Sequence, residues 1–171
     1  MFFPDTFPRP RRMPGMKVLV AYDSRKGTTR AVAERIALVA QGTTPDVTVS
    51  HVGALSPGEA AGADVLFLGA WTRGLFLIGV GPSEGAVEWA QGLPELEGTL
   101  GAVFCTYGLN AQGTLPALTS LLRAKGVEVL GSHGSKHRNR LAGVEEFARE
   151  IMAQARQRSG PRSSGDRALR P

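Results

Sequence analysis

Uninterrupted apolar runs of strand length recur along this chain and limit the folds open to it. "KVLVAY" (17–22), "ADVLFLGAW" (63–71) and "LGAVFCTY" (100–107) lack the alternation of a strand with one wet face. Such runs are typical of strands covered on both sides, as in a parallel sheet between two helical layers. "VEVLGS" (127–132) predicts a shorter strand. "PDVTVSHV" (45–52) instead alternates apolar with polar residues, as a half-exposed edge strand does.

Segments with helical periodicity separate these strands. The stretch 28–42 repeats apolar residues at helical spacing and ends at Gly42, and further helices are predicted over 82–93, 112–126 and 140–155. This alternation predicts an α/β fold, with a five-stranded parallel sheet and helices on both faces. The strand order 2-1-3-4-5 would place the alternating second strand at an edge. Ligands of such sheets bind at the carboxyl ends of the strands, near strands 1 and 3.

The chain divides by composition into one folded unit and two tails. Its 171 residues suffice for a single buried core, which we assign to residues 16–155. Residues 1–15 and 156–171 are rich in Pro, Arg, Ser and Gly, and we expect both tails to be disordered. Together they carry eight Arg and two Asp, so the net charge of the tails is +6, which exceeds the net charge of +5 of the whole chain. The folded unit is therefore almost neutral and gives no indication of a nucleic-acid partner.

Several chemistries find no support in the sequence. The single cysteine, Cys105, excludes an internal disulfide and a zinc framework, so a reducing, cytoplasmic location is expected. No apolar run approaches the roughly 20 residues that cross a membrane. The first strand is followed neither by G-x-G-x-x-G nor by G-x-x-x-x-G-K-[ST]. His133 and His137 in "HGSKH" lack a third ligand, so we expect a polar loop there, no metal and no catalytic side chain.

The stretch "YDSRKGTTRAVAERIA" (22–37) leaves the first strand through a polar turn and enters a helix. Hydroxyl groups of Ser24, Thr28 and Thr29, beside Gly27, could hold an anion at the helix N-terminus. Taken alone the turn is equally well explained as a simple helix cap. Two aromatic residues, Trp71 and Tyr107, end strands 3 and 4 on the same rim. A planar ligand with a terminal phosphate suits that combination.

The same stretch resembles the phosphate-binding signature of the flavodoxin-like family. Ser24, Gly27, Thr28 and Thr29 match it, while Lys26 stands where the family usually has Thr or Ser. "LGAWTRG" and "CTYGLN" are similar to the family's loops after strands 3 and 4. The resemblance covers about 16–155, is the main support for the strand order given above, and identifies a short-chain or divergent member.

The resemblance implies an FMN site built from three segments. The phosphate would lie at Ser24, Arg25, Lys26, Gly27, Thr28 and Thr29, and the ring between Ala70, Trp71, Thr72, Arg73 and Gly74 on one side and Thr106, Tyr107, Gly108 and Asn110 on the other. Lys26 either attracts the phosphate or points outward. Arg73 either raises the flavin potential or is a solvated surface residue.

Three functions remain open at this point. The favoured one is a flavoprotein that carries electrons between a reductase and an acceptor, so its partner is a redox protein. The second is a flavin-dependent reductase for a small apolar or quinone-type substrate, admitted beside the apolar stretch 74–82. That stretch is expected to be a loop that serves as a lid, a docking patch or core packing. The third is a flavin-free interaction domain in which Lys26 marks a lost phosphate site.

Overall fold

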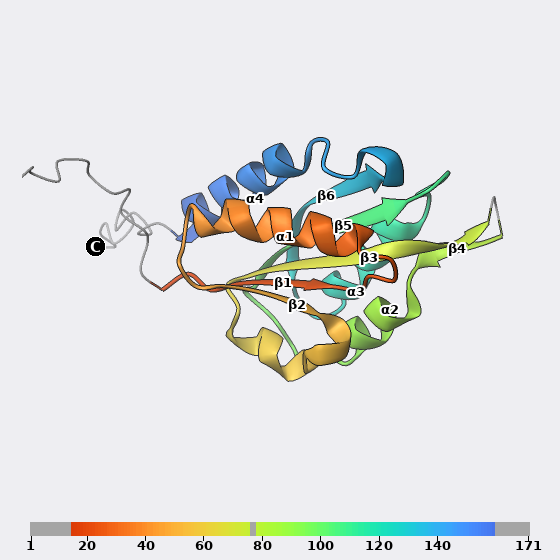
Figure 1. The fold of residues 1–171 in the computed structure, drawn as a ribbon. Helices are drawn as coiled ribbons and strands as arrows, with labels where there is room; N and C mark the ends of the chain where they lie inside the picture. The colour runs from red at the N-terminus through yellow and green to blue at the C-terminus, as the bar shows by residue number, and fades with distance from the viewer. Residues whose placement is uncertain (1–14, 76–77, 160–171) are drawn as a thin grey trace, which may run out of the picture.

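The computed structural model describes residues 15–75 and 78–159. A twisted sheet forms the central layer, with helices on both of its faces (Figure 1). In chain order the elements are β1 (Val18–Tyr22), α1 (Thr28–Gln41), β2 (Val47–His51), the 3-10 turns η1 (Val52–Ala54) and η2 (Pro57–Gly62), β3 (Val65–Leu75), β4 (Ile78–Pro82), α2 (Glu84–Gln91), β5 (Leu100–Tyr107), α3 (Thr114–Arg123), β6 (Glu128–Lys136), η3 (His137–Asn139) and α4 (Val144–Ser159).

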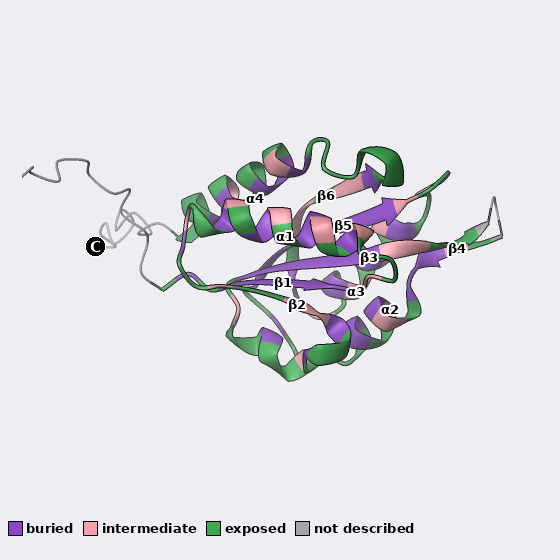
Figure 2. Cartoon of the chain, viewed as in Figure 1, coloured by how far each residue is buried: buried purple, intermediate pink, exposed green. Residues whose placement is uncertain are grey.

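Five of the strands are parallel and lie in the order β2-β1-β3-β5-β6. This is the predicted order, with the alternating strand β2 at one edge. In the middle of the sheet, Val20 of β1 is in register with Val49 of β2 on one side and with Phe67 of β3 on the other. β1 is buried throughout, β3 up to Ala70 and β5 up to Thr106, as their unbroken apolar runs predict (Figure 2).

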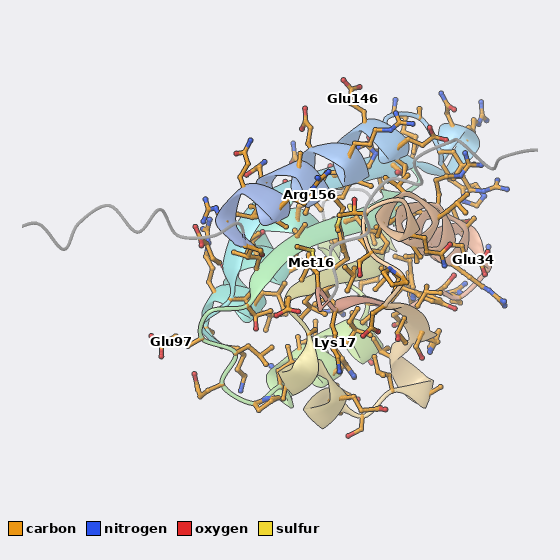
Figure 3. The ribbon with its side chains drawn as sticks, turned by 90° about the vertical axis from the view of Figure 1, so that its left-hand side faces the viewer. Met16, Lys17, Glu34, Glu97, Glu146 and Arg156 are labelled. Carbon is orange, nitrogen blue, oxygen red and sulfur yellow. The ribbon has the colours of Figure 1, made fainter. Side chains whose placement is uncertain are left out.

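Each face of the sheet has its own hydrophobic core. Val20, Phe67 and Phe104 pack beneath α1 and α4, whereas Leu68 and Val103 pack against α2 and α3. Both faces are thus covered, as predicted. Figure 3 views the molecule from the end opposite the carboxyl ends of the strands. Among the described residues, no helix combines the length and the apolar character that crossing a membrane requires.

The prediction of five strands is wrong, because β3 continues into a hairpin. β3 extends to Leu75, four residues past its predicted end, and pairs antiparallel with β4. The apolar stretch 74–82, expected to be a loop, therefore contributes a sixth strand; its residues 76 and 77 lie outside the described part. Gly74 turns the chain at φ +100, and a Cβ there would lie 2.6 Å from the Gly79 carbonyl oxygen.

Several boundaries also differ from the prediction. α2 begins at Glu84, not at Pro82, and β6 continues to Lys136. The last helix begins only at Val144, after Gly143 at φ +73, and ends at Ser159. Residues 156–159, expected to be part of the tail, are therefore helical. The remainder of both predicted tails, 1–14 and 160–171, lies outside the described residues.

Candidate functional site

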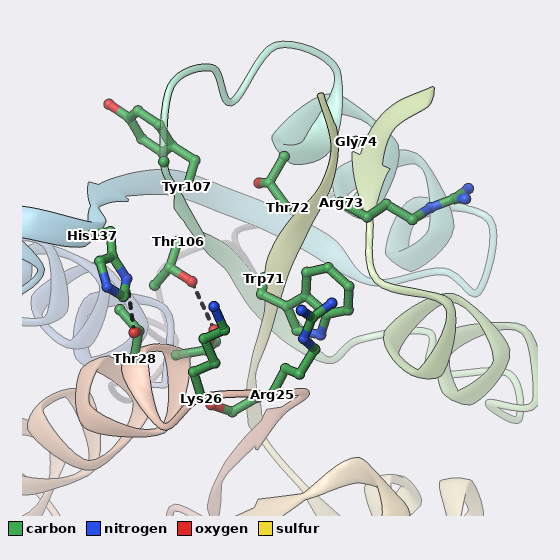
Figure 4. A pocket seen from close by; sticks show the side chains of 13 residues that line it. Arg25, Lys26, Thr28, Trp71, Thr72, Arg73, Gly74, Thr106, Tyr107 and His137 are labelled. Carbon is green, nitrogen blue, oxygen red and sulfur yellow. Dashed lines mark hydrogen bonds between the residues drawn. The ribbon is translucent and has the colours of Figure 1, made fainter. Parts of the chain in front are cut away.

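A pocket of about 440 Å³ opens at the carboxyl ends of the central strands, above the first turn of α1 (Figure 4). Four segments that are distant in sequence line it: Ser24, Arg25, Lys26, Thr28, Thr29, Trp71, Thr72, Arg73, Gly74, Thr106, Tyr107, Gly108 and His137. All the residues predicted for a ligand site are among them except Gly27, Ala70 and Asn110. The parallel topology brings these segments together, because the loops after β1, β3 and β5 leave the sheet at one rim.

The three exceptions have other positions. Ala70 is fully buried in the core that faces α2 and α3. Asn110 lies beyond the pocket, where its Oδ1 accepts a hydrogen bond of 2.8 Å from the Gln112 amide. Gly27 is the N-cap of α1 at φ +85, and its amide donates to the Ser24 Oγ at 3.1 Å. It shapes the turn without lining the pocket.

The N-terminus of α1 faces the pocket without a cap of its own. No side chain bonds the first amides of this 14-residue helix, and its first turn, Thr28–Ala31, contains no acidic residue. Free amides and the positive end of the helix dipole therefore point toward the pocket wall, where Thr28 and Thr29 add hydroxyl groups. This arrangement favours an anionic group.

Two threonine contacts tie this turn to other strands. Thr29 Oγ1 lies 2.8 Å from Thr106 Oγ1 of β5, and both residues are buried. Thr28 Oγ1 lies 3.0 Å from Nδ1 of His137, which follows β6. Sequence reasoning missed His137, since 109 positions separate it from Thr28 and no local signal links them. The nearby His133 is separate, because its ring stacks on Phe147 with centroids 5.3 Å apart.

Trp71 offers the largest aromatic surface of the site. The Arg25 guanidinium carbon lies 5.2 Å from the centroid of the Trp71 ring, a cation–π arrangement that Figure 4 shows. Tyr107 stands at the end of the neighbouring strand β5. Both aromatic residues are half-buried, so part of each remains open to a planar ligand.

The pocket lining is cationic. Arg25, Lys26 and Arg73 contribute full charges, and no Asp or Glu is among the described residues that line it. Arg73 is held to the side: its Nε donates to the Pro82 carbonyl at 3.1 Å and its Nη1 lies 3.8 Å from Glu84. Figure 4 shows it extended away from the other lining side chains. The positive charge is thus concentrated around Lys26 and Arg25.

A histidine–aspartate pair supports the start of the turn. His51 Nδ1 accepts from the Gly53 amide at 2.9 Å, and its Nε2 lies 3.1 Å from Asp23 Oδ1 and 3.4 Å from the Ser24 amide nitrogen. The Asp23 carboxylate, which precedes Ser24, is thereby engaged behind the pocket. The Asp23 carboxylate therefore does not offset the positive charge of the pocket lining.

Cys105 and Thr72 complete the description of the site's floor. Cys105 is fully buried, and burial raises the pKa of its thiol to about 11, so the thiol is protonated at neutral pH. It is a core residue, as the apolar run around it predicts. The buried Thr72 hydroxyl lies beside the Cys105 thiol and partly opposes this rise in pKa.

Comparison with known proteins identifies the fold. No protein-family model matches the sequence, and no curated protein matches it significantly. Solved structures do match. The two-electron reduced flavodoxin of Megasphaera elsdenii superposes with a TM-score of 0.69 at 23% identity, over 80% of this chain and 98% of that one. Flavodoxin 1 from Bacillus cereus gives 0.67 at 18% identity, over 80% and 97%.

A larger protein also contains the same architecture. The rubredoxin oxygen:oxidoreductase of Desulfovibrio gigas matches with a TM-score of 0.69 at 19% identity. The match covers 87% of this chain but 38% of that one. At such identities the likeness establishes the fold, and the chain has a flavodoxin-like fold.

Proposed function

We propose that this chain binds FMN in the pocket and carries electrons between a reductase and an acceptor protein. One observation carries the proposal: the free N-terminus of α1, its two threonine hydroxyls and Lys26 share a single pocket with the ring of Trp71. This pairing of an anion site with an aromatic face suits a flavin mononucleotide. The presence of flavodoxins among the structural neighbours supports it.

The residues present fit the nucleotide in size and charge. A volume of about 440 Å³ lies within the range of small-molecule sites, roughly 300–1,000 Å³. The lining contains no carboxylate that would repel a phosphate.

Each segment would then have a distinct role. Ser24, Arg25, Lys26, Gly27, Thr28 and Thr29 would form the phosphate turn, with Gly27 acting through its conformation. Trp71 and Tyr107 would contact the ring, and the backbone from Thr72 to Gly74 and at Gly108 would border its edge. The flavin supplies one- and two-electron chemistry, whereas the protein holds it and shields it from water. Ala70 and Asn110 drop out of the proposed contacts, since neither lines the pocket.

The redox partner is proposed to be a protein. The β3–β4 hairpin extends past the sheet beside Trp71, so it would limit how a second molecule reaches the ring (Figure 1). The match to part of a rubredoxin oxygen:oxidoreductase supports electron transfer as the context.

We place the activity in the cytoplasm, a reducing compartment that suits a chain whose single cysteine is a buried free thiol.

FMN binding tests the proposal directly. Purified protein should be yellow, and denaturation should release FMN. Titration of the flavin-free protein with FMN should show quenching of flavin fluorescence, and Thr28→Val should weaken binding by about 1 kcal/mol, the contribution of one hydrogen bond. Thr48→Val on the exposed strand β2 serves as the matched control, because Thr48 lies outside the pocket.

Two results would contradict the proposal. A colourless protein without affinity for FMN would make a flavin-free interaction domain the better description. A protein that binds FMN but takes up two electrons together in a redox titration, without a one-electron stage, would favour the flavin-dependent reductase over the carrier.

A further inference from the structure

We propose that His137 is a ligand of the nucleotide's phosphate and that, with Lys26, it makes the pocket selective for a dianionic phosphomonoester. The inference rests on the proposed function and extends it to a residue outside the phosphate turn. His137 lies on the segment that follows β6, and it reaches the pocket only through the fold (Figure 4).

The position of the imidazole is the first support. Its Nδ1 lies 3.0 Å from Thr28 Oγ1, and Thr28 is the first residue of α1. The first residues of an uncapped helix are where an anion receives amide and hydroxyl hydrogen bonds. An anion that accepts the Thr28 hydroxyl is therefore a direct neighbour of the His137 ring, which faces the same pocket.

The charge of the ligand is the second support. A phosphomonoester carries about −1.5 to −2 at neutral pH. In the turn, Lys26 forms no ion pair with any described residue, whereas Arg25 lies against Trp71. The His137 imidazole, which lines the same pocket, adds a ring nitrogen that can hydrogen-bond the phosphate held by Lys26.

No other group near His137 offers it a competing partner. Among the described residues, no carboxylate lies within 4.0 Å of its ring nitrogens. On α1, Arg30 and Glu34 are paired with each other at 2.8 Å. The flanking Lys136 and Arg138 are cations, and the turn contributes Arg25 and Lys26, while β5 contributes the neutral Tyr107. The groups named around His137 are therefore cationic or neutral, and this favours an anionic ligand.

A purely structural role for His137 makes a different prediction. The contact between Thr28 and His137 is exposed, and exposed polar contacts contribute little to stability. If the contact served only to hold η3 against α1, its loss would affect the binding of phosphorylated and unphosphorylated ligands alike. Riboflavin, which is FMN without the phosphate, separates the two roles.

The test measures the dissociation constants of FMN and riboflavin for the full-length protein and four variants. His137→Ala and His137→Gln remove the imidazole, Lys26→Gln removes the cation of the turn, and Arg138→Gln removes a full charge from the adjacent exposed residue that does not line the pocket. His137→Ala should weaken FMN binding about tenfold, or about 1.4 kcal/mol, and leave riboflavin binding unchanged. His137→Gln should show part of that loss, since glutamine keeps polarity without the imidazole ring.

The controls make the outcome decisive. Arg138→Gln should change the FMN constant by less than about twofold. The inference is overturned if His137→Ala matches Arg138→Gln, or if FMN and riboflavin lose affinity equally. Failure of the unaltered protein to bind FMN at all is a distinct result, which overturns the proposed function as well.

Discussion

Replacing Thr29 by Val tests the link between the phosphate turn and the sheet. Thr29 and Thr106 are 1% and 4% exposed, and their hydroxyls lie 2.8 Å apart. Valine keeps the shape of threonine but leaves the Thr106 hydroxyl buried without a partner. An unsatisfied buried hydroxyl costs about 1–3 kcal/mol. We expect Thr29→Val to lower the free energy of unfolding by that amount, and Tm by about 2–4 °C for each kcal/mol in a chain of this size.

Urea denaturation followed by circular dichroism measures the effect. Thr106→Val should cost about as much as Thr29→Val, whereas the double variant should be close to the unaltered protein, because neither hydroxyl is then left unpaired. Thr48→Val, on an exposed strand position, is the control and should stay within about 0.5 kcal/mol. Single variants as stable as this control, or a double variant whose loss equals the sum of both, would refute the reasoning.

Two further predictions concern the buried Gly69 and the half-buried His133. A Cβ on Gly69 would lie 2.1 Å from the ring of the fully buried Phe104 and would clash with it. Gly69→Ala should therefore reduce the free energy of unfolding by about 1–3 kcal/mol. Gly62→Ala, with open space around its Cβ, is the control, and equal urea midpoints would contradict the prediction. Burial lowers the pKa of His133, so the unfolded chain binds the proton more readily. Stability should fall as pH drops below about 6.5 toward that lowered pKa, and His133→Gln, which should flatten this profile, checks the assignment.

Much of the site was predictable because its signals are local. The turn from Ser24 to Thr29 joins a strand to a helix within one stretch of sequence, and Trp71 and Tyr107 mark strand ends that a parallel sheet must bring to one rim. The resemblance to the family's loop after strand 3 implies a site that includes Ala70 together with Trp71. Side chains of a strand alternate between its faces, and Ala70 points into the core.

The hairpin shows where local patterns fail. Residues 74–82 are apolar and rich in glycine, a composition that suits a loop as well as a strand. Pairing across Gly74 and Gly79 decides the outcome, because β3 supplies the backbone partners that β4 needs. Strand formation at this point depends on a neighbour and not on intrinsic preference.

The sequence by itself determined the α/β class, the order of the parallel strands through its likeness to a known family, and the polar strand-to-helix turn after β1. These follow from hydrophobic periodicity and from residues adjacent in the chain. Only the tertiary structure decided that Thr29 bonds Thr106 and that His137 joins Thr28, across separations of 77 and 109 positions. Such contacts depend on how strands and helices pack. A hydrogen bond forms only when packing brings two side chains within a few ångströms, and no local sequence pattern specifies that distance.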